Sequence, residues 1–199
     1  MSKILDGLTL KGQPAEIPDC TRYDLPGFFK EMGYTVGAEI GVYKGQFSER
    51  LCQAGLKLYA VDSWLIYPDY QGTGGQQRME LLYEGTKKTL APYDCTIIRK
   101  TSMEALADVP DQSLDFVYID GNHDFRYVAE DICEWSKKVR VGGTISGHDY
   151  FFKDPSGRTT PVPYVVIAYT AAHKINNWYV LGQQEGGKAE MWRSWMWIK

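Results

Sequence analysis

The chain has 199 residues, with 22 Lys and Arg against 25 Asp and Glu, which gives a formal net charge of −3. With 44% apolar, 24% charged and 14% aromatic residues it has the composition of a globular protein, which excludes disordered, collagen-like and low-complexity classes. Its basic residues are scattered along the chain, so we expect no nucleic-acid partner.

The length favours a single domain over residues 1–199, with residues 1–35 as an N-terminal extension that includes a first helix. No stretch reaches the roughly 20 apolar residues of a membrane span, and the first residues lack the apolar run of a signal peptide. We therefore expect a cytoplasmic protein with no membrane partner.

Short apolar runs alternate with amphipathic stretches, a pattern that is typical of a parallel sheet wrapped by helices. Each predicted strand is almost continuously apolar or β-branched, as strands covered on both faces are. The predicted strands are Val36–Ile40, Leu58–Val61, Thr96–Arg99, Leu114–Ile119 and Gly143–Ser146.

Three segments between these strands repeat apolar residues at helical spacing. Asp124 precedes the third segment and is a good N-cap residue. Tyr164–Tyr169 follows Pro163, which favours the first position of a helix, and we predict a helix there. The three apolar faces consist of Phe47, Leu51 and Ala54; of Met79, Leu82, Tyr83, Thr86 and Leu90; and of Val128, Ile132, Trp135 and Val139.

Trp178–Leu181 and Met191–Ile198 are predicted strands close in sequence, which indicates a C-terminal antiparallel hairpin. Large apolar side chains occupy both alternating faces of the last strand. That strand should lie inside the sheet or bury one face against another subunit, so a homodimer stays open. The segments Ser63–Gly75 and Phe151–Val162 follow strand ends and are long enough to be lids or specificity loops.

The segment AEIGVYKGQFSERL places a strand end at Glu39 immediately before a glycine-containing turn and a helix. Such a crevice at strand ends binds ligands in open α/β sheets, and Gly41 lets the backbone approach a ligand closely. Asp62 ends the next strand, 21 residues after Gly41, where an acid accepts the two hydroxyls of a ribose. Together these features predict a ligand that contains a nucleoside.

Two nucleoside ligands fit this pattern, a dinucleotide such as NAD and S-adenosylmethionine. The pyrophosphate of a dinucleotide needs a close glycine turn, which Tyr43 would crowd. Glu39 fits better beside a ligand that carries an amine or a cation. The residues therefore favour S-adenosylmethionine.

Two further strand ends carry acids and imidazoles. Asp120 ends one strand and is followed by His123, and His148 and Asp149 end the next strand. Neighbouring strand ends lie about 5 Å apart, so Asp120 and Asp149 are expected to share one cation. Two of the three histidines of the chain gather here, which favours a functional site.

The segments AEIGVYKGQFSERL, AVDSW, KTSMEAL, DFVYIDGNHDF with WSKKVRVGG, and SGHDY together resemble a class I S-adenosylmethionine-dependent methyltransferase. The similarity covers about residues 36–150 and is closest to the small group of sugar and macrolide O-methyltransferases and cephalosporin-hydroxylase-like proteins. It implies an α/β, Rossmann-like, seven-stranded, mostly parallel sheet with helices on both faces and a C-terminal antiparallel hairpin.

The resemblance also implies roles for individual residues. The methionine side of the cofactor would be lined by Glu39, Gly41, Val42, Tyr43 and Gly45, and Asp62 would hold the ribose. Ser63 or Trp64 would flank the adenosine, and Ser102 and Met103 would contact adenine. Asp120 would also belong to the cofactor-binding residues. Asp120, His148 and Asp149 would hold a divalent metal, Mg or Mn; imidazole favours Mn, Fe or Zn over Mg, and the sequence leaves the use of a metal open.

These expectations define a function with its alternatives. The expected reaction is methylation of a hydroxyl on a small polar acceptor, such as a sugar or glycoside, with Asp120, His123 and His148 as the catalytic residues and His123 or His148 as the base. The alternatives are a nucleoside-binding scaffold or sensor without catalysis, and a hydroxylase-like or NAD-dependent enzyme on the same fold.

Overall fold

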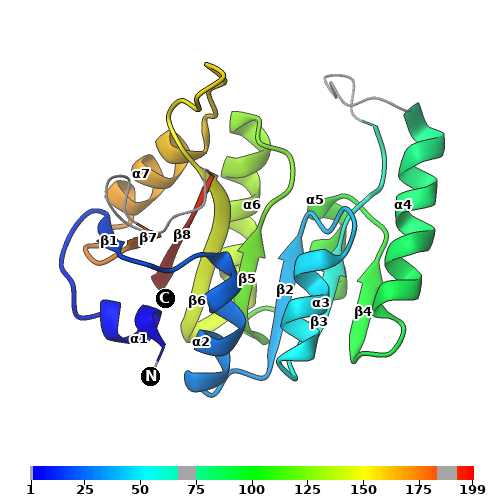
Figure 1. The fold of residues 1–199 in the computed structure, drawn as a ribbon, viewed down its shortest axis with the longest axis horizontal. Helices are drawn as coiled ribbons and strands as arrows, with labels where there is room; N and C mark the ends of the chain where they lie inside the picture. The colour runs from blue at the N-terminus through cyan, green and yellow to red at the C-terminus, as the bar shows by residue number, and fades with distance from the viewer. Residues whose placement is uncertain (1, 67–74, 183–191) are drawn as a thin grey trace.

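The computed structural model describes residues 2–66, 75–182 and 192–199 and contains one central sheet with helices on both faces (Figure 1). The eight strands lie in the order β1-β7-β8-β6-β5-β2-β3-β4. The predicted α/β, mostly parallel fold is confirmed. The strands are β1 (Ala15–Ile17), β2 (Val36–Ile40), β3 (Lys57–Val61), β4 (Cys95–Ile98), β5 (Leu114–Ile119), β6 (Val139–Tyr150), β7 (Tyr179–Leu181) and β8 (Arg193–Ile198).

The four strands β3, β2, β5 and β6 are paired in parallel, so their carboxyl ends meet at one edge of the sheet. β8 runs antiparallel to both β6 and β7, which confirms the C-terminal hairpin. Both faces of β8 are covered within this chain, because Trp195 and Trp197 pack on one side of the sheet and Met196 on the other. These apolar side chains of β8 are therefore buried without a second subunit. Met191 lies outside the described residues.

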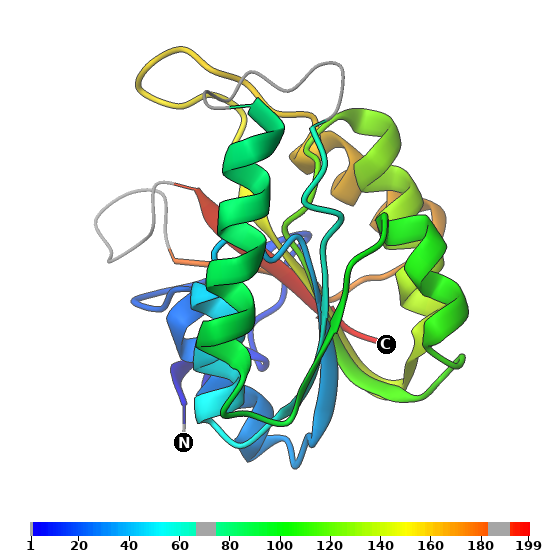
Figure 2. The same cartoon turned by 90° about the vertical axis from the view of Figure 1, so that its right-hand side faces the viewer.

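The helices divide between the two faces of the sheet (Figure 2). The helices α1 to α4 pack with Phe116 and Tyr118 of β5 on one face. On the other face α5, α6 and α7 pack with Val117 of β5 and Ile145 of β6. They are α1 (Lys3–Gly7), α2 (Leu25–Glu31), α3 (Gln46–Gln53), α4 (Gly75–Leu90), α5 (Ser102–Ala105), α6 (Phe125–Lys138) and α7 (Val162–Ala172), with short 3-10 turns η1 (Arg22–Asp24) and η2 (Leu106–Asp108).

Within the described residues the sheet has eight strands rather than the expected seven, because the three-residue β1 adds a parallel edge strand beside β7. Val139, assigned by its spacing to the third helix, is the first residue of β6. β6 also continues to Tyr150, four residues beyond the predicted end at Ser146, so His148 and Asp149 belong to the strand itself. No helix in the described part of the chain has the length and apolar content needed to cross a membrane.

Asp115 of β5 ties three segments together at the sheet edge opposite the carboxyl ends. Its carboxylate accepts the N–H groups of Thr35 at 2.7 Å and Val36 at 3.0 Å, and the Arg140 guanidinium at 2.7 Å. Burial alone would raise the pKa of Asp115, but these hydrogen bonds lower it below its usual value. The ionised carboxylate therefore stabilises the folded state.

We expect Asp115→Ala to lower the free energy of unfolding at neutral pH by about 2–4 kcal/mol, since buried N–H groups lose a charged acceptor. The folded-state pKa lies below the unfolded value of about 3.9, so this stabilisation is complete above that pH and disappears as the pH falls through the folded pKa. Urea unfolding at about pH 7 and pH 3 should therefore show the difference between wild type and variant shrinking in acid.

Asp111→Ala provides the matched control, because Asp111 is an exposed acid whose partner is Lys138 at 2.7 Å. A surface ion pair contributes about 0–1 kcal/mol, so this variant should unfold almost like the wild type. Equal destabilisation of both variants would contradict the role given to Asp115.

Candidate active site

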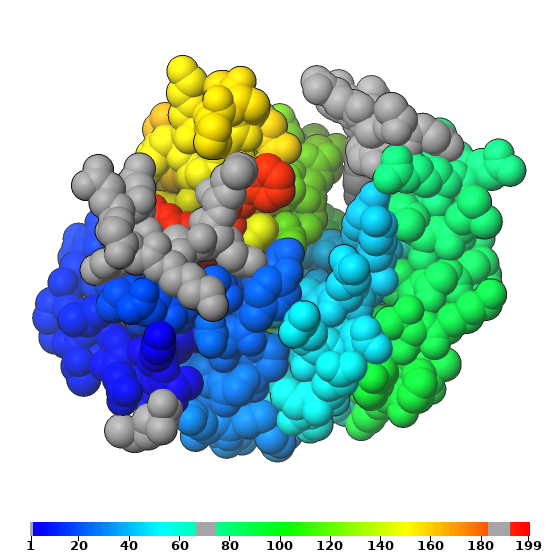
Figure 3. Space-filling model, viewed as in Figure 1, coloured from blue at the N-terminus to red at the C-terminus, as the bar shows by residue number. Residues whose placement is uncertain are grey.

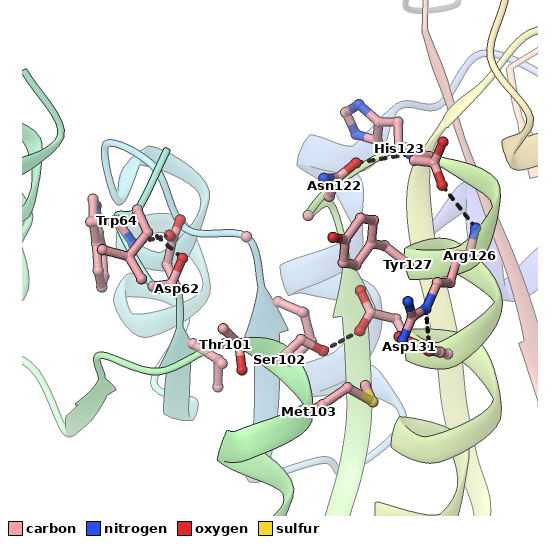
Figure 4. A pocket seen from close by; sticks show the side chains of 18 of the residues that line it. Asp62, Trp64, Thr101, Ser102, Met103, Asn122, His123, Arg126, Tyr127 and Asp131 are labelled. Carbon is pink, nitrogen blue, oxygen red and sulfur yellow. Dashed lines mark hydrogen bonds and ion pairs between the residues drawn. The ribbon is translucent and has the colours of Figure 1, made fainter. Parts of the chain in front are cut away.

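A cavity of about 840 Å³ opens at the carboxyl ends of the parallel strands. Figure 3 shows this face of the molecule hollowed between the blue-to-cyan β2–β3 side and the green α6. One wall is formed by Gly41, Asp62 and Trp64, and the opposite wall by His123 and residues of α6. The strand ends named in the sequence therefore face one another across a single cavity (Figure 4).

Asp62 holds the backbone of the first turn and of its own loop. Its Oδ2 accepts the N–H groups of Val42 at 3.0 Å and Tyr43 at 2.9 Å, and its Oδ1 accepts the N–H of Trp64 at 2.8 Å. A carboxylate oxygen has two lone-pair directions, so one acceptor site on Oδ1 stays available for a ligand hydroxyl. Asp62 lines the cavity, as its expected ribose role requires.

Gly41 is required by the packing of two strand ends. Its φ is 92°, and a Cβ at this position would lie 2.1 Å from the backbone oxygen of Asp120. We expected a ligand to approach this glycine closely, whereas the closest approach in the structure is that of the chain itself. Gly41 lines the cavity, while Val42, Tyr43 and Gly45 are not among the residues that do.

Glu39 lies behind the turn and does not line the cavity. Its side chain is buried and accepts a hydrogen bond from the Ser48 hydroxyl of α3. Burial raises the pKa of Glu39 well above its usual value, although the Ser48 hydrogen bond opposes the shift. Glu39 thus joins β2 to α3 and is not among the residues that line the cavity.

Ser63, Trp64, Ser102 and Met103 all line the cavity. The Trp64 ring is buried against Tyr83 of α4, with ring centroids 4.9 Å apart, and its Nε1 donates to the Tyr43 carbonyl at 2.9 Å. Trp64 therefore presents only part of its surface to a ligand.

Asp131 of α6 also lines the cavity, and the sequence analysis missed it. Its side chain is 3% exposed and accepts a hydrogen bond from the Ser102 hydroxyl. Burial raises the pKa of Asp131 to about 7, although the Ser102 hydrogen bond opposes the shift. The sequence signal for this residue is its place between Val128 and Trp135, on the apolar face of the helix. An ionisable side chain is unusual there, because its burial costs free energy unless it has a partner.

Four side chains from two strand ends form an acid–imidazole cluster, defined as Asp120, His123, His148 and Asp149. The Nε2 of His123 lies 2.7 Å from Asp149 Oδ2 and 3.4 Å from Asp120 Oδ1. The Nδ1 of His148 lies 3.8 Å from Asp120 Oδ1 and 3.7 Å from Asp149 Oδ2. The structure thus brings together all four residues that the sequence placed here, and among them His123 lines the cavity.

The cluster strongly perturbs its members. Burial alone would lower the pKa of His123, but its hydrogen bonds with Asp120 and Asp149 raise it to about 10. Burial would likewise raise the pKa of Asp149, but the two imidazoles hold it well below its usual value. Asp149 also has a φ of 58°, a backbone conformation that a residue with a side chain rarely adopts.

Two arginines reach the cluster from distant segments, and the sequence analysis identified neither. The Arg22 guanidinium, from η1, lies 3.2 Å from Asp120 Oδ2. Arg158, from the segment between β6 and α7, lines the cavity 3.9 Å from Asp149 Oδ1. No local sequence pattern marks either residue, since both depend on tertiary packing.

The donor atoms of the cluster fit a divalent metal. One ligand atom each from Asp120, His123 and Asp149 lie within 4.8 Å of one another, so His123 rather than His148 completes the most compact set. Two carboxylates and two imidazoles are ligands that suit Mn, Fe or Zn. Arg22 pairs with Asp120 Oδ2, whereas His123 pairs with Asp120 Oδ1 and Asp149 Oδ2.

Comparisons with known proteins match the same region of the chain. A family model described as a methyltransferase domain matches residues 38–150, which is more than half of the chain. The uncharacterized protein y4gI of Sinorhizobium fredii is 26% identical over 117 residues, which cover 56% of this chain and 12% of that protein. The chain thus spans a small part of the length of that relative.

Solved structures share the fold at low sequence identity. The O-methyltransferase of Bacillus cereus, in complex with SAH, has a TM-score of 0.61 at 12% identity, with 89% of this chain and 80% of that chain covered. The O-methyltransferase TomG of Streptomyces achromogenes, in complex with SAM, has a TM-score of 0.61 at 13% identity, with 89% and 79% covered. Because the family model matches more than half of its residues, this chain belongs to the methyltransferase domain family.

Proposed function

We propose that this methyltransferase acts on a hydroxyl of a small polar acceptor, such as a sugar or glycoside. The observation that carries the proposal is the pairing of His123 with Asp149 at 2.7 Å, in the cavity that Asp62 and Ser102 also line. Removing a hydroxyl proton needs a base held by a second group, and this pair has that form. The O-methyltransferases among the structural neighbours agree with this choice.

Residues on the two walls of the cavity would have different roles. Asp62, Ser102 and Met103 would bind the nucleoside, while Asp131 supplies a buried acid beside Ser102. The bound cofactor supplies a methyl group on a sulfonium, an electrophile that a positioned oxygen attacks in line. The chain must therefore align the acceptor oxygen and remove its proton.

His123 is the base we favour, because it lines the cavity and is oriented by Asp149. His148 is the less accessible of the two histidines, with its side chain 7% exposed against 39% for His123. Asp120 and Asp149, with His148 or His123, would hold a divalent metal, which would polarise the acceptor hydroxyl as a Lewis acid.

The family match sets aside the NAD-dependent and hydroxylase-like readings of the sequence. A scaffold that binds the nucleoside without catalysis would bind S-adenosylmethionine and transfer no label from it to any acceptor. Isotopically labelled S-adenosylmethionine and a panel of hydroxyl acceptors test the proposal directly. Label on an amine or thiol instead of a hydroxyl would overturn it.

Asp62→Ala should weaken S-adenosylmethionine binding at least about ten-fold, since the nucleoside loses a hydroxyl acceptor and three backbone N–H groups lose theirs. Isothermal titration calorimetry measures the effect, and thermal unfolding reports whether the variant is folded. Asp94→Ala is the control, because Asp94 is an exposed acid that precedes β4, away from the cavity. Unchanged affinity in Asp62→Ala would remove the ribose role of this residue.

Asp149→Asn should lower kcat/KM by about 100-fold or more, because His123 loses the carboxylate that orients it. Below the pKa of His123, the neutral imidazole fraction rises with pH, so wild-type kcat/KM should rise between about pH 7 and pH 9. The variant cannot stabilise the imidazolium as well, so its profile should shift to lower pH. An unchanged rate and profile would exclude Asp149 from the mechanism.

Removal of metal with a chelator should inhibit the wild type if the acid–imidazole cluster holds a divalent ion, and Mn²⁺ should restore activity better than Mg²⁺. Dialysis against EDTA followed by metal addition measures this effect. Full turnover in chelator would exclude the metal and leave proton removal to histidine.

A further inference from the structure

The segment between β6 and α7 brings one arginine to the cavity in a fixed place. Asp154 Oδ1 accepts the N–H groups of Ser156 and Arg158, each at 2.9 Å, and the Ser156 hydroxyl at 2.6 Å. The Asp154 N–H in turn donates to the Arg158 carbonyl at 2.9 Å. These bonds close a turn that directs Arg158 to the wall shared with His123.

Aromatic rings flank the guanidinium of Arg158, and its ion pair with Asp149 is long, at 3.9 Å. The guanidinium lies 5.4 Å from the ring centroid of Phe151 and 5.2 Å from that of Trp192, and the side chain is 53% exposed. Contacts between a guanidinium and ring faces leave its N–H groups free to donate in its own plane. Arg158 is therefore held in place while most of its donors stay available.

The acids around Arg158 have closer partners. Asp149 lies 3.9 Å from the guanidinium but 2.7 Å from His123, and Asp120 is paired with Arg22 at 3.2 Å. The other arginine of the cavity wall, Arg126, is paired with Glu130 at 2.8 Å. Among the described residues that line the cavity, Arg158 is thus the arginine without an acid at hydrogen-bond distance.

We propose that Arg158 binds a carboxylate or phosphate group of the methyl acceptor, so that the enzyme acts on anionic hydroxyl compounds. A guanidinium binds either group through two parallel N–H donors. Because Arg158 and His123 both contact Asp149, the anion would lie close to the oxygen that is methylated. This inference rests on the proposed hydroxyl methylation and specifies the class of its substrate.

The test is the affinity of protein saturated with S-adenosylhomocysteine for glucose, glucuronate and glucose 6-phosphate at constant ionic strength. These probes share one ring and differ in the absence of charge, a carboxylate or a phosphate. At least one of the two anionic sugars should bind at least about ten-fold more tightly than glucose. The identity of that sugar distinguishes a carboxylate site from a phosphate site. Arg158→Gln should abolish that preference, and Arg158→Lys should keep part of it because the charge remains.

Lys153→Gln is the matched control, because Lys153 is an exposed cation of the same segment that does not line the cavity. It should leave the preference unchanged, and equal thermal unfolding midpoints should show that every variant is folded. Three equal affinities in the wild type, or a preference that survives Arg158→Gln, would overturn the proposal. So would a ten-fold loss of S-adenosylhomocysteine affinity in Arg158→Gln, which would assign the arginine to the cofactor carboxylate.

The binding measurement needs no turnover, so it separates this inference from the proposed reaction. Selective binding of an anionic sugar through Arg158, with label from S-adenosylmethionine appearing on no hydroxyl, would support the anion site and reject hydroxyl methylation. Label on the hydroxyls of glucose and of both anionic sugars with equal efficiency would support the reaction and reject the anion site.

Discussion

Three strand ends are joined at the backbone of Gly41, and the site depends on that junction. The Gly41 N–H donates to the Val61 carbonyl of β3 at 2.9 Å, and the preceding Ile40 carbonyl accepts the Asp120 N–H at 2.7 Å. A Cβ at Gly41 would lie 2.1 Å from the Asp120 oxygen, so only glycine permits this spacing. Backbone packing alone therefore brings Asp62, the glycine turn and the acid–imidazole cluster to one cavity.

The sequence was sufficient for the parallel core, because strands buried on both faces appear as short apolar runs. It was insufficient for β1, since three residues carry no periodicity and Ala15–Ile17 becomes a strand only through pairing with β7. The glycine at position 41 indicated a close backbone approach, but its place in the sequence could not show that the residue approaching it is Asp120. Asp131 could have been found, since a carboxyl on the apolar face of a helix is unusual.

The two arginines of the cluster could not have been found from local sequence. Arg22 meets Asp120 across 98 residues of chain, and the contact exists because η1 places it over the end of β5. Arg158 depends on a turn closed by Asp154 and on Trp192, which is close in space to the segment after β6 because β8 pairs with that strand. Contacts of this kind depend on the assembled sheet, so residues that reach the cluster from distant segments are the least predictable part of the site.

The acids of the site differ in how they are held, Asp62 by backbone N–H groups and Asp149 by an imidazole. Asp62 accepts three backbone N–H groups, and two of the donors, Tyr43 and Trp64, have positive φ values of 52° and 47°. Asp149 itself has a positive φ, a strain that typically costs about 1–3 kcal/mol and lasts only where the surroundings impose it. It also shares the imidazole of His123 with Asp120, so two carboxylates that would repel each other are held together by cationic groups. A nucleoside-binding surface needs no such cluster of paired acids and imidazoles, whereas a site that must accept a proton or bind a cation needs its charged groups held in place in advance.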